Sequence, residues 1–175
     1  MQLMHVAVCV ALNVGLGKVA NLVGIPLTMD TIGTILAAAL LPWYLTVLVG
    51  LLSSAASAIV IHPAFALYAG TQVAIALVAY ALVRSGGFRN LWLAALSGLA
   101  LGIVSAIVSA PVTAIVFGGV SVPSLTAINA VLLASGVSLW RSVLTGALIV
   151  ESLDKVFAGI LAYHIVRRVR AFDTP

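Results

Sequence analysis

Five ionisable side chains in this sequence have the types and the spacing to take part in binding or catalysis. Each lies within or beside a long apolar run: Lys18, Asp30, Glu151, Asp154 and Lys155. On a helix, the spacing of three and four residues between Glu151, Asp154 and Lys155 places all three on one face. A charge at the centre of a bilayer costs about 3 kcal/mol on insertion scales, and such residues usually face a bundle interior or a polar pathway. The five charges therefore predict a buried polar site.

Three uses of these charges are open. Lys18 and Lys155 could neutralise the three acids in an internal ion-pair network. Some of the groups could instead bind a polar or zwitterionic solute, which is the interpretation that we favour. A proton relay, a common role of carboxylates in membrane pumps, is the third. The first two overlap, because a binding site needs supporting ion pairs.

Further polar residues extend the candidate site. Asp30 also fits the plain role of a helix N-cap, since an acidic side chain accepts hydrogen bonds from the free N–H groups at a helix start. Thr31 and Thr34 would then lie on the same helix face. His62 precedes Pro63 at a helix junction, where an interfacial role competes with a role in binding. The predicted substrate-binding residues are Asn13, Lys18, Asn21, Asp30, Thr31, Thr34, His62, Tyr68, Gln72, Glu151, Asp154 and Lys155.

Composition indicates the environment of these residues. The chain has 175 residues, of which 63% are hydrophobic and 7% are charged, and its mean hydropathy is +1.28. Soluble domains carry about 25% charged residues, so we predict an integral membrane protein. A spanning helix takes about 20 apolar residues, and six fit. We predict an all-α bundle in one domain, 1–175, with helices at about 5–23, 30–41, 44–61, 64–83, 91–116 and 140–166, and an outer loop with a short helix at 117–139.

The distribution of Lys and Arg predicts the orientation. Arg84 and Arg89 lie in the connection between the fourth and fifth helices, and Arg167, Arg168 and Arg170 lie in the tail. With six spans these two segments are on one side, which the positive-inside rule makes cytoplasmic. Both termini are then cytoplasmic, and the candidate site opens outward.

Several functions are excluded by missing motifs. No glycine-rich loop followed by Lys-Ser/Thr is present, so the chain by itself does not hydrolyse ATP. Hydrolase and zinc-protease motifs are also missing, and we predict no enzyme. One cysteine and three scattered histidines give no metal-type spacing, so we predict neither a metal site nor a cofactor. The net charge of +4 indicates membrane orientation rather than nucleic-acid binding.

Small residues recur at helical spacing in two places. Such stripes let helices approach closely in lipid. We attribute the stripe Gly98, Gly102, Ala106 and Ala110 to packing within the bundle. For a second stripe at the other end of the sequence, packing and docking onto another membrane protein are equally open. It consists of Ala7, Ala11 and Gly15.

The chain resembles the substrate-binding S component of energy-coupling factor (ECF) vitamin transporters. The likeness is carried by the six-helix architecture, the missing ATPase motif, Ala7-x-x-x-Ala11, and the segments 11–18 and 30–34. It implies a multi-pass protein of a prokaryotic plasma membrane that captures a vitamin or related micronutrient from outside. It also implies that Ala7 and Ala11 dock onto a membrane T component, driven by two cytoplasmic ATPases that use ATP. The subunit would topple in the bilayer to release solute inward, with 24–29 and 117–139 as gates.

The expected ligand and two other functions stay open. Sites for flat ring vitamins are usually rich in stacking aromatics, and here the outer half offers only Phe65, Tyr68, Phe117 and Trp140. The charges suit a solute with several polar groups, such as a pyridoxine-type, pantothenate-type, pyrimidine-precursor or nucleoside-like molecule. A self-sufficient ion-coupled transporter would often show internal repeats, and none is clear. In a non-transport membrane sensor or assembly module, the charges would be structural pairs.

Overall fold

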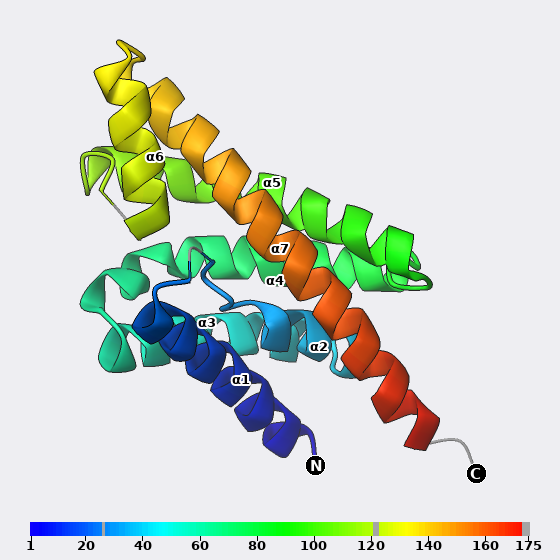
Figure 1. Cartoon of the computed structure of the whole chain (residues 1–175). Helices are drawn as coiled ribbons and strands as arrows, with labels where there is room; N and C mark the ends of the chain where they lie inside the picture. Colours follow the sequence, from blue (N-terminus) through cyan, green and yellow to red (C-terminus); the bar gives the residue numbers. More distant parts are fainter. Residues whose placement is uncertain (26, 121–122, 173–175) are drawn as a thin grey trace.

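The computed structural model of this chain describes residues 1–25, 27–120 and 123–172, and side chains for 1–25, 27–120 and 125–168. Within these residues the regular structure is entirely helical, as predicted (Figure 1). Predictions that fall on residues 26, 121–122 and 173–175, or on the Arg170 side chain, lie outside this description. The helices are α1 Gln2–Val23, α2 Ile32–Leu40, α3 Trp43–Val60, the 3-10 helix η1 Pro63–Tyr68, α4 Ala69–Arg84, α5 Leu91–Ile115, α6 Pro123–Ala134 and α7 Leu139–Phe172.

Four of the described helical segments are long and apolar enough to cross a membrane. They are Gln2–Val23, Trp43–Val60, Pro63–Arg84 and Leu91–Ile115. By contrast, α2 has nine residues, and at about 1.5 Å per residue it is much shorter than a hydrocarbon core of about 30 Å. The apolar helices are therefore compatible with a multi-pass membrane protein. Six spans and the side of the termini stay predictions.

The short helix α2 lies at the centre of the other helices. Each of its residues from Ile32 to Ala38 is buried, and α2 contacts α1, α3, α4 and α7. Ile35 and Leu36 pack in one hydrophobic core with Ile75 of α4 and Leu101 of α5. A helix that is apolar all round is typical of such a buried position.

Close packing of α5 against α7 positions the ionisable residues of α7. Figure 1 shows α7 running diagonally across α5, and the two helices are in extensive contact. A Cβ atom on Gly102 would lie 2.7 Å from the carbonyl oxygen of Glu151, and one on Gly98 would overlap the carbonyl oxygen of Lys155. The small-residue stripe of α5 therefore packs inside the bundle, against the turn of α7 that carries the charges.

The structure differs from the predicted helix boundaries in two places that matter for the site. The segment predicted as one helix at 64–83 is divided, because Pro63–Tyr68 forms η1 and α4 begins only at Ala69. Asp30, predicted at a helix start, lies before α2, whose N-cap is Thr31 without a side-chain capping bond. The carboxylate of Asp30 is instead bonded to side chains of other helices, as described below.

Candidate binding site

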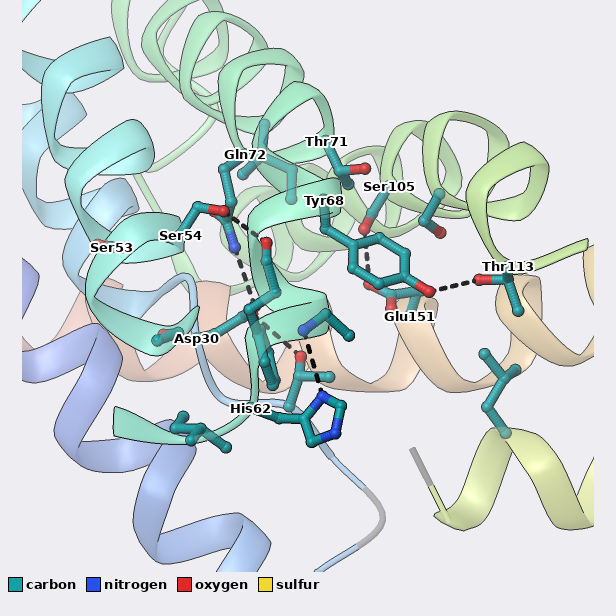
Figure 2. Close-up of a pocket in the computed structure, with 18 of the residues that line it drawn as sticks. Asp30, Ser53, Ser54, His62, Tyr68, Thr71, Gln72, Ser105, Thr113 and Glu151 are labelled. Carbon is teal, nitrogen blue, oxygen red and sulfur yellow. Dashed lines mark hydrogen bonds between the residues drawn. The ribbon is translucent and has the colours of Figure 1, made fainter. Parts of the chain in front are cut away.

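A cavity of about 400 Å³ lies between the segment that precedes α2 and helices α3, η1, α4, α5 and α7. Most side chains of its wall are polar, although they come from predominantly apolar helices. Figure 2 shows several of them, with Asp30 and Gln72 on one side and Ser105, Thr113 and Glu151 on another. The lining residues are Asn21, Thr28, Asp30, Ser53, Ser54, Ser57, Ile61, His62, Ala64, Phe65, Tyr68, Thr71, Gln72, Ile75, Ser105, Ser109, Thr113, Phe117, Val120, Leu125, Glu151 and Lys155.

The cavity brings together part of the predicted site. The predicted substrate-binding residues that line it are Asn21, Asp30, His62, Tyr68, Gln72, Glu151 and Lys155. The predicted residues that lie elsewhere are Asn13, Lys18, Thr31, Thr34 and Asp154.

Lys155 is the centre of an ion cluster at the cavity wall. Its Nζ lies 2.6 Å from Asp154 Oδ2, 3.2 Å from Asp30 Oδ1 and 3.2 Å from Glu151 Oε2. The Asp154 side chain is fully buried, whereas those of Asp30 and Glu151 are each 14% exposed. We call these four residues the Lys155 cluster. One positive and three negative groups give it a formal charge of −2, and two of its carboxylates line the cavity.

Asp154 ties the irregular segment before α2 to α7. Its Oδ1 accepts a hydrogen bond of 2.8 Å from the backbone N–H of Met29, and its Oδ2 lies 2.7 Å from Thr28 Oγ1. Met29 has a φ of 50°, so this N–H reaches α7 from an uncommon backbone conformation. Within a bilayer, non-helical backbone is tolerated only where it is buried in protein or lines a cavity. Thr28 and Asp30 do line the cavity, so Asp154 acts behind the wall as a positioning residue.

Hydroxyl groups from α5 form a second side of the cavity. Ser105, Ser109 and Thr113 follow one another at intervals of four residues, so they share one helix face. Ser105 Oγ donates to Glu151 Oε2 at 2.6 Å. Thr113 Oγ1 lies 2.9 Å from the hydroxyl of Tyr68, a contact drawn in Figure 2. This side therefore offers hydroxyls along its length and supports one of the cavity carboxylates.

An aromatic pair completes that side. The ring of Tyr68 stacks on Phe117 with centroids 6.0 Å apart and an angle of 14° between the planes. Both residues line the cavity. The end of η1 places Tyr68 there, so the 3-10 segment has a direct effect on the site.

Two buried polar atoms of α4 have no hydrogen-bond partner among the described residues: Thr71 Oγ1 and Gln72 Oε1. Both residues line the cavity and are only 6% exposed. The other end of the Gln72 amide, Nε2, donates to Asp30 Oδ2 at 2.9 Å, as Figure 2 shows. An unpaired buried polar group costs about 1–3 kcal/mol. Both atoms are closed to solvent in this structure, so a donor of a bound solute that reaches them, with a small shift of neighbouring side chains, would stabilise the complex.

The predicted residues outside the cavity have structural contacts. Asn13 is fully buried and donates to Thr34 Oγ1 and Ser53 Oγ, each at 2.9 Å, and accepts from the N–H of Gly33 at 2.7 Å. These bonds join α1 to α2 and α3. Lys18 donates to the carbonyl oxygen of Val60 at 3.1 Å, near the end of α3. Thr31 is buried at the start of α2.

The serine and threonine residues that α3 and α5 contribute to the cavity were not predicted from the sequence. Ser53 and Ser57 of α3 are four residues apart, and α5 repeats the same spacing. Hydroxyl residues that recur every four positions within an apolar run indicate a polar helix face. It was missed because each serine or threonine alone is unremarkable in a membrane helix, where small residues are common.

The chemistry of this site has to be argued from its own geometry, because no protein-family model, curated protein or solved structure matches this chain. In the part of the chain that the structure describes, no three His, Cys, Asp or Glu side chains are grouped so that they could hold a metal ion. The ammonium group of Lys155 lies where the three carboxylates converge. The arrangement can therefore bind a polar molecule through charge and hydrogen bonds.

Proposed function

We propose that this chain is the substrate-binding membrane subunit of an ATP-driven importer of the ECF type, and that it captures a vitamin-like solute from outside. The observation that carries the proposal is the cavity of about 400 Å³ in which a charged cluster and unpartnered polar atoms converge. Its size suits a small molecule, since ligand pockets are typically about 300–1,000 Å³. Delivery to the inside would require partner subunits that use ATP.

Burial of polar groups supports binding over a purely structural role. A structural ion pair needs only matched charges, as Lys155 and Asp154 provide at 2.6 Å. Asp30 and Glu151 are additional to that pair and both reach the cavity. The unpaired acceptor of Gln72 lies beside them. Polar groups that converge in one concave cavity can fix the orientation of a ligand, as they do in known ligand sites.

The proposed membrane arrangement has six crossings with both termini cytoplasmic. The second crossing would combine the irregular segment before α2 with α2 itself, and α7 would be the sixth. On α1, the stripe of Ala7, Ala11 and Gly15 is exposed, and an added Cβ at Gly15 would meet nothing within 4 Å. This exposed stripe supports docking of α1 onto a membrane T component, which two cytoplasmic ATPases would drive.

Binding by the isolated chain tests the proposal directly. We would purify the full chain in detergent from cells grown in rich medium and analyse it by native mass spectrometry. We expect one retained small molecule per chain, lost in Glu151→Gln. Arg141→Gln is the matched control, because Arg141 is exposed and does not line the cavity, and we expect it to retain the molecule.

The outcomes separate the candidate functions. An empty wild-type chain that is also not stabilised by small-molecule extracts would contradict a binding subunit. Uptake of the retained molecule into liposomes by this chain alone would contradict dependence on partners and indicate a secondary transporter.

A further inference from the structure

The cavity has an excess of negative charge that the protein does not balance. Asp30 and Glu151 line it, and Lys155 is the only lysine or arginine among the described lining residues. Lys155 is already paired at 2.6 Å with Asp154 behind the wall. The wall therefore presents two carboxylates whose charge is shared with one ammonium group that is itself neutralised.

The hydrogen-bonding capacity of Lys155 is exhausted within the protein. A lysine ammonium group has three N–H donors. Four oxygen atoms lie within 3.2 Å of its Nζ, one each from Thr28, Asp30, Glu151 and Asp154. No donor of Lys155 is left for an anionic solute.

The spare capacity of the same wall consists of acceptors. In Glu151 both Lys155 and Ser105 contact Oε2, and no donor from the described residues reaches the other carboxylate oxygen. Gln72 Oε1 is an unpartnered acceptor in a residue that is 94% buried. The donor of the same amide, Nε2, is already bonded to Asp30. A ligand for this wall must therefore bring donors, and a positive charge would offset the carboxylates.

The neighbouring side of the cavity, formed by η1 and α5, fits the rest of such a ligand. The rings of Tyr68 and Phe117 are stacked 6.0 Å apart, and aromatic faces attract cations within about 6 Å as well as flat rings. Hydroxyls of Ser109 and Thr113 lie along the same side. The cavity thus combines an acidic wall with an aromatic and hydroxylated one.

We infer that the ligand is an organic cation: a molecule with a protonated amine or a cationic ring, bound with its positive, donor-bearing end at Asp30, Glu151 and Gln72. This inference rests on the proposed binding function and assigns its substrate class. A free metal ion is a poorer fit, because Lys155 already lies among the carboxylates. Among the described lining residues, an anionic vitamin would meet two carboxylates and no lysine or arginine with a free donor.

Charge fractionation of a small-molecule pool tests this inference without knowledge of the ligand. An ultrafiltered extract of rich growth medium is separated by ion exchange at neutral pH into cationic, neutral and anionic fractions. Thermal unfolding of the full chain in detergent is measured with each fraction. We expect the cationic fraction alone to raise the melting temperature, and the molecule recovered from the complex to carry a positive charge by mass spectrometry.

Variants then locate the charge recognition. We expect Glu151→Gln to weaken binding of the recovered molecule by about tenfold or more, because a charge-assisted hydrogen bond is lost. Asp30→Asn is the second variant in case Glu151→Gln does not fold. Arg141→Gln is the control with unchanged affinity.

Each outcome bears on a different claim. Stabilisation by the neutral or anionic fraction would overturn the cationic ligand and leave the binding function standing. Unchanged affinity in folded Glu151→Gln and Asp30→Asn would overturn recognition by these carboxylates. Failure of all three fractions, together with an empty chain in native mass spectrometry, would overturn the proposed function and this inference with it.

Discussion

Lys155 holds three carboxylates together at a point that is almost closed to solvent. Its side chain is 2% exposed, and Asp154 beside it is fully buried. Removing one partner of a buried ion pair leaves an uncompensated charge, whereas removing an excess charge relieves repulsion. The residues of the Lys155 cluster should therefore respond very differently to neutral substitutions, although all are charged and adjacent.

The first prediction compares Lys155→Met with Glu151→Gln. Lys155→Met leaves three carboxylates without their cation, so we expect a loss of about 3–5 kcal/mol in stability or failure to fold. Glu151→Gln keeps the shape and removes one of the two excess negative charges, so we expect a much smaller change. Thermal unfolding of both variants in the same detergent is the measurement. Equal stability of the two would contradict the role of Lys155 as the central counter-ion.

A second residue-scale prediction concerns Asn13, which the structure places in the core. Asn13→Ala removes bonds to Thr34, Ser53 and Gly33, and unpaired buried groups cost about 1–3 kcal/mol each. We expect a clear loss of stability, with ligand affinity of the folded fraction unchanged. Asn21→Ala, at an exposed position on the same helix, is the control and should retain its melting temperature. Weaker ligand binding without a loss of stability would contradict this structural role and indicate that Asn13 takes part in binding.

At the scale of elements, the contact of α5 with α7 determines where the charges lie. Gly98 and Gly102 let the two backbones approach at the carbonyl groups of Lys155 and Glu151. A methyl group there has no space, because backbone atoms rather than flexible side-chain ends lie against it. Accommodation requires α5 and α7 to separate. A displacement of α7 would move it relative to the segment before α2, to which Asp154 is bonded.

The third prediction is that Gly102→Ala destabilises the chain and weakens ligand binding together. Overpacking typically costs about 1–3 kcal/mol, and the shift of α7 would disturb the distances around Lys155. Gly15→Ala is the matched control, since its Cβ meets nothing within 4 Å and alanine favours a helix by about 1 kcal/mol over glycine. Melting temperatures and ligand titrations of both variants are the measurements. Normal binding by Gly102→Ala would show that the site tolerates movement of α7.

Part of this arrangement was predictable from sequence, and the reason differs by residue. Glu151 and Lys155 were predictable because charge in an apolar helix must turn inward and their spacing fixes a common face. The contact of Lys155 with Asp30 depends on the path of the irregular segment, which the helical spacing of the charged residues does not reveal. Asn13 and Lys18 looked equivalent to site residues, because polarity alone does not tell which neighbour a helix face meets. The break at Pro63–Tyr68 was hidden because its residues are as apolar as those of α4.

At the scale of the whole molecule, the proposed topology can be tested by placing single cysteines in two loops that it assigns to opposite sides of the membrane. Ser85 follows α4 and Ser138 precedes α7, and both are exposed. In a Cys9→Ala background, we expect an impermeant maleimide to label Ser138→Cys in intact cells and Ser85→Cys only after permeabilisation. This follows from the placement of Arg84 and Arg89 on the cytoplasmic side. Labelling of both from the same side would contradict the proposed six crossings.

Because the acidic residues that the structure describes gather around Lys155, the charged residues left on the exterior of that part of the chain are basic. The chain has four acidic residues, and all those that the structure describes belong to the cluster. Two arginines outside it rest on aromatic rings: Arg84 lies 4.9 Å from the centre of the Tyr80 ring, and Arg167 lies 5.6 Å from that of Tyr163. A ring holds a guanidinium group without cancelling its charge, so mobile anions or lipid phosphates must supply the counter-charge. Ionic strength and headgroup composition should thus act on these exposed arginines, while the buried Lys155 cluster is screened much less.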